Sequence, residues 1–227
     1  MDSPGRAARS GGLARVKDSI HAHHQHPPDV TPSFRFGEQI TVGGFRADEV
    51  SSSLQKSIRR GNDAESERHA IFWATELDLS GFGNYAFKRL RVIASEDVGP
   101  AWPEGPAVIR ALYENWQHEK KAAGKDANPG VGMLYLVHAV ILLCRAEKSR
   151  VVDDACMVFY AGDRAAMGVE VPDYAVDHHT ARGRSLGRTE ASVYDSSYLI
   201  THESETVDNP YHDEARAIDG APPVRPR

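Results

Sequence analysis

The longest apolar run of the chain, residues 131–144, constrains its fold more than any other feature of the sequence. Crossing a bilayer takes ~20 consecutive apolar residues in a helix, and this run is shorter. Its apolar side chains would surround a helix on almost every side, which is typical of a helix buried at the centre of a protein. We therefore predict a helical core around residues 131–144 and no membrane span.

The sequence before this run predicts four amphipathic helices, because apolar residues recur at intervals of three or four positions. Asp48, Asp63 and Asn84 are the predicted N-caps of the first three, and Pro106 stands in the predicted first turn of the fourth. The side chains predicted to face inward are those of Val50, Leu54, Ile58, Ile71, Ala74, Leu77, Phe87, Leu90, Ile93, Ala94, Val108, Leu112 and Trp116.

Two further helices are predicted after the run. Ser149 is the predicted cap of the first, with Val152, Cys156 and Phe159 turned inward. The second is predicted over residues 172–187, because a proline is well tolerated in the first turn of a helix. Together with the earlier segments, these predict an all-α fold, a helical bundle.

Two other local features bear on the fold. Residues 34–45 are the only segment that alternates as a strand does, with a predicted hairpin turn at Gly43 and Gly44. The two cysteines, Cys144 and Cys156, have no CxxC partner and lie in apolar runs. We expect both to be buried thiols in a reducing compartment.

The helical domain, predicted over residues 34–200, lies between two polar segments. Residues 1–33 predict a disordered arm and residues 201–227 a polar tail. The net charge of -5 argues against a generally basic, nucleic-acid-coating protein, but it is compatible with a local basic face. No apolar stretch of a signal peptide follows the first arginines, so a cytoplasmic protein is expected. Four clustered histidines are interpreted as part of the polar arm: His21, His23, His24 and His26.

Motifs of nucleotide hydrolysis and of common hydrolases are missing from the sequence. It has no GxxxxGK[ST], the loop whose backbone cradles phosphates and whose hydroxyl binds magnesium, and Gly124-Lys125-Asp126 lacks both the upstream glycine and the hydroxyl. GxSxG, HExxH and GxGxxG do not occur either. A non-catalytic protein is therefore expected more than an enzyme, and no cofactor is predicted.

Several short stretches resemble the C-terminal helical region of the RarA/MgsA family of AAA+ ATPases, which are related to clamp loaders. They are QKSIR at 55–59, FW at 72–73 and RLRVIASEDVG at 89–99. AEKS at 146–149 is similar to the family's Ala-Pro-Lys-Ser, and VP at 171–172 falls where the family has a Val-Pro. The resemblance implies an all-helical collar that forms tetramers and lies beside DNA at stalled replication forks. In the family this region follows the ATPase core, so ATP-driven activity is not carried over.

Basic residues on two predicted helices are candidates for contacts with nucleic-acid phosphates. Such groups bind through release of counterions and need no reading of base sequence. The alternative is that they lie on solvated faces and pair with nearby acids. The candidates are Lys56, Arg59, Arg60, Lys88, Arg89 and Arg91.

The carboxylates of Glu96 and Asp97 stand at the predicted end of the third helix. They could bind a metal ion or accept a proton. We favour a structural role, because carboxylates at a helix C-terminus oppose the helix dipole and need a cationic partner. Arg89 and Arg91 are the predicted partners.

The predicted last helix carries a second candidate site, for an anion or a nucleotide. Placing Tyr174, His178 and Arg182 at intervals of four would align them on one stripe. Gly183 would let another backbone or a phosphate approach closely. A metal-dependent hydrolase would need further ligands from other helices, so no metal ligand is assigned. The residues of this candidate site are Lys148, Asp177, His178, Arg182, Arg184 and Arg188.

Three functions follow from these patterns. The first is a non-catalytic domain associated with DNA replication and repair, which forms homo-oligomers and binds nucleic acid or a replication protein. The second is a small nucleotide-binding protein or metal-dependent hydrolase that uses the segment Asp177-His178-His179. The third is a scaffold that only assembles.

Overall fold

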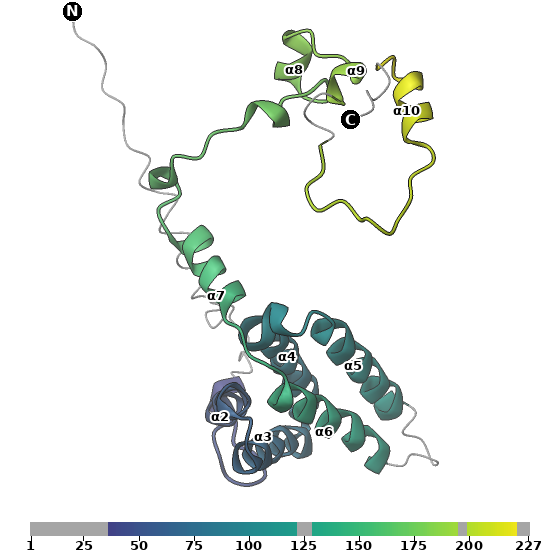
Figure 1. Cartoon of the computed structure of the whole chain (residues 1–227). Helices are drawn as coiled ribbons and strands as arrows, with labels where there is room; N and C mark the ends of the chain where they lie inside the picture. Colours follow the sequence, from purple (N-terminus) through teal and green to yellow (C-terminus); the bar gives the residue numbers. More distant parts are fainter. Residues whose placement is uncertain (1–35, 122–128, 195–198, 222–227) are drawn as a thin grey trace, which may run out of the picture. The chain divides into compact units, whose positions relative to one another are not determined.

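The computed structural model describes residues 36–121, 129–194 and 199–221, and the chain divides into two compact units, Met1–Arg164 and Ala165–Arg227 (Figure 1). Within the described residues the secondary structure is helical, with one isolated antiparallel bridge and no β-strand, which confirms the predicted all-α class. No helix in these ranges is long and apolar enough to cross a membrane. The predicted arm, residues 1–33, lies outside the described residues.

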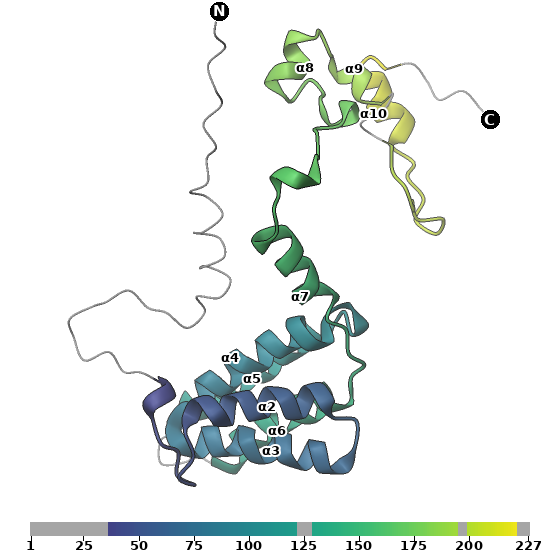
Figure 2. The ribbon, with the colours of Figure 1, turned by 90° about the vertical axis from the view of Figure 1, so that its left-hand side faces the viewer.

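Five helices of the first unit pack into a bundle: α2 (Ala47–Arg60), α3 (Ala64–Leu77), α4 (Gly83–Ile93), α5 (Gly105–Lys121) and α6 (Pro129–Arg145). Helix α3 lies between α2 and α6, and α6 packs on α5 (Figure 2). Both α4 and α6 contact all the other helices of the bundle. These contacts bury one continuous apolar core.

The central position predicted for residues 131–144 is confirmed, but the helix is not buried on every side. On α6, Leu136, Val140 and Leu143 are fully buried, whereas the Leu134 side chain is 66% exposed. An apolar residue therefore remains at the surface of the helix. On α5, Leu112 and Trp116 are buried as predicted and Ile109 is fully buried as well, whereas Val108 is only partly buried against the core.

Of the three predicted N-cap residues, only Asp63 caps a helix in the structure. Asp63 caps α3, with its carboxylate accepting hydrogen bonds from the backbone N–H groups of Glu65 and Ser66 at 3.0 and 2.9 Å. The predictions for Asp48 and Asn84 are wrong. Both lie inside the first turn of their helices, because α2 already begins at Ala47 and α4 at Gly83.

The predicted hairpin at residues 34–45 is reduced to one bridge, between Ile40 and Arg46. The turn inside it is closed by the hydrogen bond from Thr41 N to Phe45 O, 2.8 Å long. Gly43 is tied to the bundle, because its N–H donates to Glu76 Oε1 of α3 over 2.6 Å. The segment is thus bound to α3 through this hydrogen bond and does not form part of a sheet.

A wide π-helical turn, Ala94–Val98, follows α4 and ends at Gly99. Gly99 has φ +52° and ψ −136°, a conformation that L side chains rarely adopt. The predicted end of the helix at Gly99 is confirmed. This turn matters for the site because it carries Glu96 and Asp97.

Helix α7 (Val151–Cys156) continues into a second π-helical turn, Met157–Ala161. The prediction that its apolar side chains face inward is wrong. Val152 is 37% and Phe159 52% exposed, and Cys156 is also exposed. The periodicity identified an apolar helix correctly, but the main contacts of α7 outside its own following turn are with the turns after α4, Ala94–Val98 and Gly99–Ala101. Among the described residues, its apolar side chains therefore stay largely exposed.

The described residues of the second unit form three short α-helices, α8 (Ala181–Ser185), α9 (Glu190–Val193) and α10 (His212–Ile218), besides two 3-10 turns. The prediction of a single helix over residues 172–187 is wrong. A tight turn at Asp177 interrupts it, because the Thr180 hydroxyl caps α8 by accepting from Gly183 N at 2.9 Å. Helix α10 lies in the segment predicted as a tail, where acids stand in its first turn and Arg216 in its last.

Candidate functional site

The basic residues of α2 and α4 differ in what surrounds them. Arg89 reaches from α4 to α2, where its guanidinium donates to Ser51 Oγ and Gln55 Oε1, both at 3.3 Å. These partners are neutral, so they fix the orientation of the Arg89 guanidinium without offsetting its positive charge. It therefore links the two helices and is half-buried.

Arg59 occupies a different environment, because it pairs with carboxylates. Its Nε donates to Asp97 Oδ1 at 2.5 Å and its Nη2 to Glu96 Oε1 at 3.0 Å. Asp97 is fully buried, and its other oxygen accepts from Gln55 Nε2 at 2.8 Å. A buried carboxylate needs such partners. The described contacts of Arg59 are therefore structural, because its guanidinium is already paired with two carboxylates.

The structural interpretation of Glu96 and Asp97 is confirmed, but the predicted partners are wrong. Arg59 and Arg150 bind them, not Arg89 and Arg91. Arg150 was not among the residues identified from the sequence; its Nη1 lies 2.9 Å from Asp97 Oδ1, and its Nη2 also contacts Asp153. An arginine three residues before an aspartate at a helix start was the available signal.

Four of the six candidate cations of the first unit are exposed: Lys56, Arg60, Lys88 and Arg91. None forms an ion pair with a carboxylate of the described residues. Lys56 donates to Ser52 Oγ, and the guanidinium of Arg91 lies 4.8 Å from the centre of the Tyr113 ring. Their charges are therefore accessible to an anionic partner. The stacking of Arg91 on an aromatic face holds it on the side of α4 that faces α5.

An apolar surface runs along α7 and the turn after it. We call it the α7 surface; it comprises Val151, Val152, Met157, Val158, Phe159 and Tyr160, which are between 37% and 60% exposed. A monomeric protein seldom leaves so many large apolar side chains together in water. The start of α7 is fixed to the bundle by Arg150 and by the bond from Ser149 N to Asp97 O, 2.9 Å long.

In the second unit, Asp177, His178 and His179 lie in the turn before α8. Each offers one metal-ligand atom, and these atoms lie within 4.8 Å of one another. Asp177 accepts from His179 twice, at Oδ1 from the backbone N and at Oδ2 from Nδ1, both at 3.0 Å. These bonds lower the pKa of the Asp177 carboxyl, so it stays ionised.

Two of the candidate arginines in this unit are engaged by backbone carbonyls. Arg184 Nη1 donates to His178 O at 3.1 Å and to His179 O at 2.8 Å. Arg188 pairs with Asp173, 2.6 Å away, and also donates to the carbonyl of Val176. Arg182 is exposed, and it does not align with Tyr174 and His178 because the predicted helix is interrupted.

Lys148 belongs to the first unit and caps α6. Its Nζ donates to the carbonyls of Leu143, Cys144 and Ala146 at 2.8, 3.0 and 2.5 Å. Burial lowers the pKa of this ammonium, and the nearby side chains of Cys144 and Asp97 offset this effect only in part. A lysine at the end of a helix complements the dipole. The described contacts therefore give Lys148 a structural role at the end of α6, and its anion contact stays a prediction.

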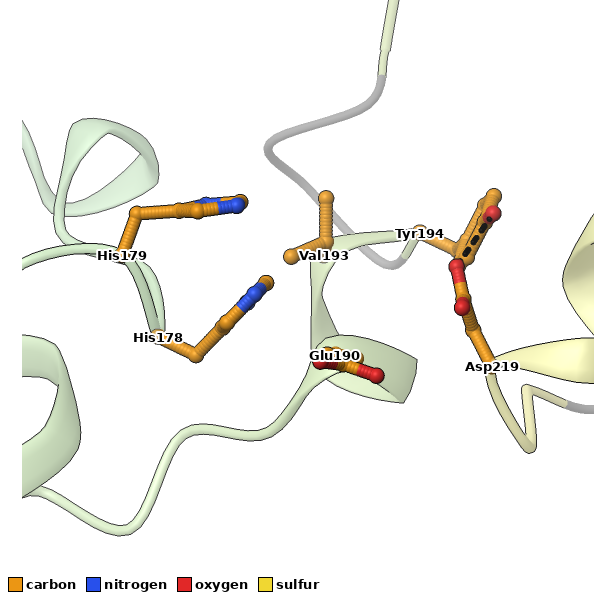
Figure 3. A pocket seen from close by; sticks show the side chains of 6 residues that line it. All are labelled: His178, His179, Glu190, Val193, Tyr194 and Asp219. Atoms are coloured by element: carbon orange, nitrogen blue, oxygen red, sulfur yellow. Dashed lines mark hydrogen bonds between the residues drawn. The ribbon is translucent and has the colours of Figure 1, made fainter.

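A shallow hollow of about 290 Å³ adjoins the histidines (Figure 3). Glu190 and Val193 of α9 line it, together with Tyr194 and Asp219. The Tyr194 hydroxyl donates to Asp219 Oδ2 at 2.8 Å, which ties the end of α10 to the end of α9. The rings of His178 and His179 point into the hollow side by side, with the Glu190 carboxylate below them (Figure 3).

Comparison with known proteins gives consistent matches. Residues 65–216 match the family model "MgsA AAA+ ATPase C terminal". The chain is 30% identical over 170 residues to replication-associated recombination protein A of Haemophilus influenzae, covering 74% of this chain and 33% of that protein. It is 29% identical over 161 residues to the protein of the same name from Escherichia coli K12, covering 70% and 32%. An AAA domain-containing protein of Mycobacterium tuberculosis is 28% identical over 146 residues, covering 64% and 30%.

The chain spans about one third of the length of these curated relatives. The matched region begins at the start of α3 and extends through α8 and α9 into α10. It contains the π-helical turn with Glu96 and Asp97 and the segment with Lys148, which are among the stretches that carried the resemblance in the sequence. On this match, the chain belongs to the family of MgsA-type AAA+ ATPase C-terminal regions.

Proposed function

We propose that this chain acts as a non-catalytic, cytoplasmic module of an MgsA-type AAA+ protein in replication-associated recombination, and that it assembles with further copies of itself through the α7 surface. The names of its relatives supply the process. The observation that carries the assembly is the exposure of six large apolar side chains on one short helix and its turn. Burying them against a second copy would remove this surface from water.

The attachment of α7 supports this assignment. Arg150 holds the first turn of α7 to Asp97, so the apolar side chains are presented on a fixed element and not on a free segment. A surface that is ordered before binding loses less conformational freedom when it binds. The family resemblance implies a tetramer.

Light scattering on the full chain tests the assembly. We expect an oligomer in the unsubstituted protein and a monomer after Phe159→Asp, because a buried carboxylate at an apolar interface would lack a partner. Val171→Asp is the matched control, since Val171 is an apolar residue that is 67% exposed elsewhere. A monomer without any substitution, or an oligomer that tolerates Phe159→Asp, would contradict the proposal.

A second candidate function, contact with the nucleic-acid backbone, is favoured by the four exposed cations. Lys56, Arg60, Lys88 and Arg91 have no carboxylate partner among the described residues. Phosphates are the partners that such groups bind without reading base sequence. Arg89 would contribute its charge from between α2 and α4.

Titration of a forked DNA over a series of salt concentrations tests this function. Binding should weaken as salt rises, and Lys88→Gln with Arg91→Gln should reduce the slope of log K against log salt by about 0.9 for each phosphate that the variant no longer neutralises. Arg110→Gln is the control, because Arg110 is already paired with Glu114. Absence of binding at low salt by the folded oligomer would remove the nucleic-acid function.

A further inference from the structure

We propose that Asp177, His178 and His179 form a binding site for a divalent transition metal ion such as zinc. The three residues are consecutive, and their ligand atoms lie within 4.8 Å of one another. Zinc, cobalt and nickel accept imidazole nitrogens and carboxylate oxygens together, whereas magnesium and calcium prefer oxygen alone. The site goes beyond the proposed function, which uses residues of the first unit.

The backbone of this turn is held from both sides. Asp177 O accepts from Thr180 N at 3.1 Å and from Thr180 Oγ1 at 2.9 Å. Gly183 packs directly on the same carbonyl, and a Cβ there would lie 1.7 Å from Asp177 O. Arg184 binds the carbonyls of both histidines. A site whose supporting contacts are in place needs less reorganisation to bind its ion.

The orientation of His179 fits a metal ligand. Its Nδ1 lies 3.0 Å from Asp177 Oδ2, so the proton is assigned to Nδ1 and the lone pair to Nε2. A carboxylate that receives one imidazole N–H while the other nitrogen binds metal is a common arrangement at zinc sites. Asp177 can therefore orient His179, and its Oδ1 offers a further oxygen nearby.

The side chain of His178 gives independent support for the metal site. Its Nδ1 is buried and has no hydrogen-bond partner within the described part of the chain. An unpaired buried nitrogen costs free energy, which a bound ion would recover. The two imidazole rings lie 3.8 Å apart, centre to centre.

The hollow beside the histidines provides room and a further carboxylate. Asp219 is engaged by Tyr194, whereas Glu190 is an exposed carboxylate on α9 that lines the same hollow as both rings (Figure 3). We assign Glu190 as the residue that completes the site by side-chain rotation, with water in the remaining positions. A pair of imidazoles with carboxylates is a ligand set that zinc takes with open positions.

Cobalt titration of the full chain, followed by visible absorption and displaced with zinc, tests the site. All measurements use a protein in which the four arm histidines are replaced by glutamine, because clustered histidines in a polar segment bind metals on their own. We expect one equivalent to bind, and His178→Gln or His179→Gln to weaken the affinity at least 10-fold. Glu190→Gln should weaken it less, and His118→Gln on α5 is the control.

NMR distinguishes a variant that has lost a metal ligand from one that has unfolded. Zinc should shift the imidazole signals of His178 and His179. Unchanged backbone signals in His179→Gln together with the disappearance of cobalt absorption would support the site. Full affinity in the folded His178→Gln, His179→Gln double variant would overturn it. Disappearance of all binding on removal of the arm histidines alone would overturn it too, because the arm would then be the only metal-binding segment.

Discussion

Arg150 Nη1 donates a hydrogen bond to Asp97 Oδ1 over 2.9 Å, and this bond joins the start of α7 to the turn that follows α4. Asp97 is fully buried, while the side chain of Arg150 is 38% exposed. The same carboxylate binds Arg59 of α2. One buried charge therefore holds three segments of the first unit together.

We expect Asp97→Ala to destabilise the first unit strongly. Breaking a buried ion pair from one side typically costs about 3–5 kcal/mol, because it leaves a charge without a partner. Since water reaches both arginines here, a loss of about 2–3 kcal/mol is expected. Urea unfolding followed by circular dichroism measures this free energy.

Asp153→Ala is the matched control for Asp97→Ala. Asp153 also binds Arg150, but its side chain is 31% exposed. A partly exposed pair at this position should contribute about 1 kcal/mol or less. Equal losses for the two variants would show that burial of Asp97 does not decide the stability of this cluster.

Two leucines on α6 allow a direct test of which side of that helix is buried. Leu136 is fully buried and Leu134 is 66% exposed. Leu136→Ala should cost about 2–5 kcal/mol, since it leaves a cavity in the core. Leu134→Ala should change stability by less than about 0.5 kcal/mol, as is usual for a surface position. Chemical unfolding of both variants checks the ranking, and a larger loss for Leu134→Ala would contradict the packing of α6.

The bundle was predictable from the sequence because its signals are local. Leu54, Phe87 and Leu143 lie on apolar stripes with helical spacing, and all three are buried. Asp63 was identifiable as a cap for the same reason, because an aspartate before an amphipathic segment satisfies the free N–H groups of the first turn. Asp48 failed because an acidic residue is as well accommodated in the first turn as at the cap.

The candidate sites were less predictable because they depend on contacts between distant segments. Arg59 and Asp97 are 38 residues apart, and no spacing rule pairs them. Phe159 has the periodicity of a core residue, but periodicity does not say whether another element covers it. His178 and His179 stood out in the sequence as neighbours of Asp177, but the turn that brings them together depends on Thr180 and Gly183, and helical spacing does not predict that turn.

The two cysteines should differ sharply in reactivity. Cys144 is buried, which raises the pKa of its thiol to about 11, whereas Cys156 is exposed. Only a thiolate reacts quickly with alkylating agents. At pH 8, we expect one thiol per chain to react in the folded Phe159→Asp monomer and a second only after unfolding in urea. Mass spectrometry of the labelled peptides identifies the reactive residue, and labelling of native Cys144 would contradict its burial.

The same thiol makes stability depend on pH in alkaline solution. Its pKa is raised by folding from 9.0 to about 11, so the folded state favours the protonated form. This contribution is complete below pH 9 and is lost as the pH rises towards 11. Its size is about 3 kcal/mol, at about 1.4 kcal/mol for each pKa unit. Cys144→Ala should flatten the decline of unfolding free energy over this range, while Cys156→Ala should leave it unchanged.

Gly183 fixes the turn of the second unit, and Gly183→Ala should disrupt that turn. A Cβ at this position would lie 1.7 Å from Asp177 O, a backbone atom that cannot rotate away. Either α8 or the turn with Asp177 must therefore move, which would break the bond from Gly183 N to Thr180 Oγ1. Hydrogen exchange of the 177–188 amides should become faster by at least 10-fold, while the amides of α3 keep their protection. Arg182→Ala, on the same helix with an exposed side chain, is the control and should leave these rates unchanged. Normal protection of the turn in Gly183→Ala would mean that α8 does not pack on Asp177 as described.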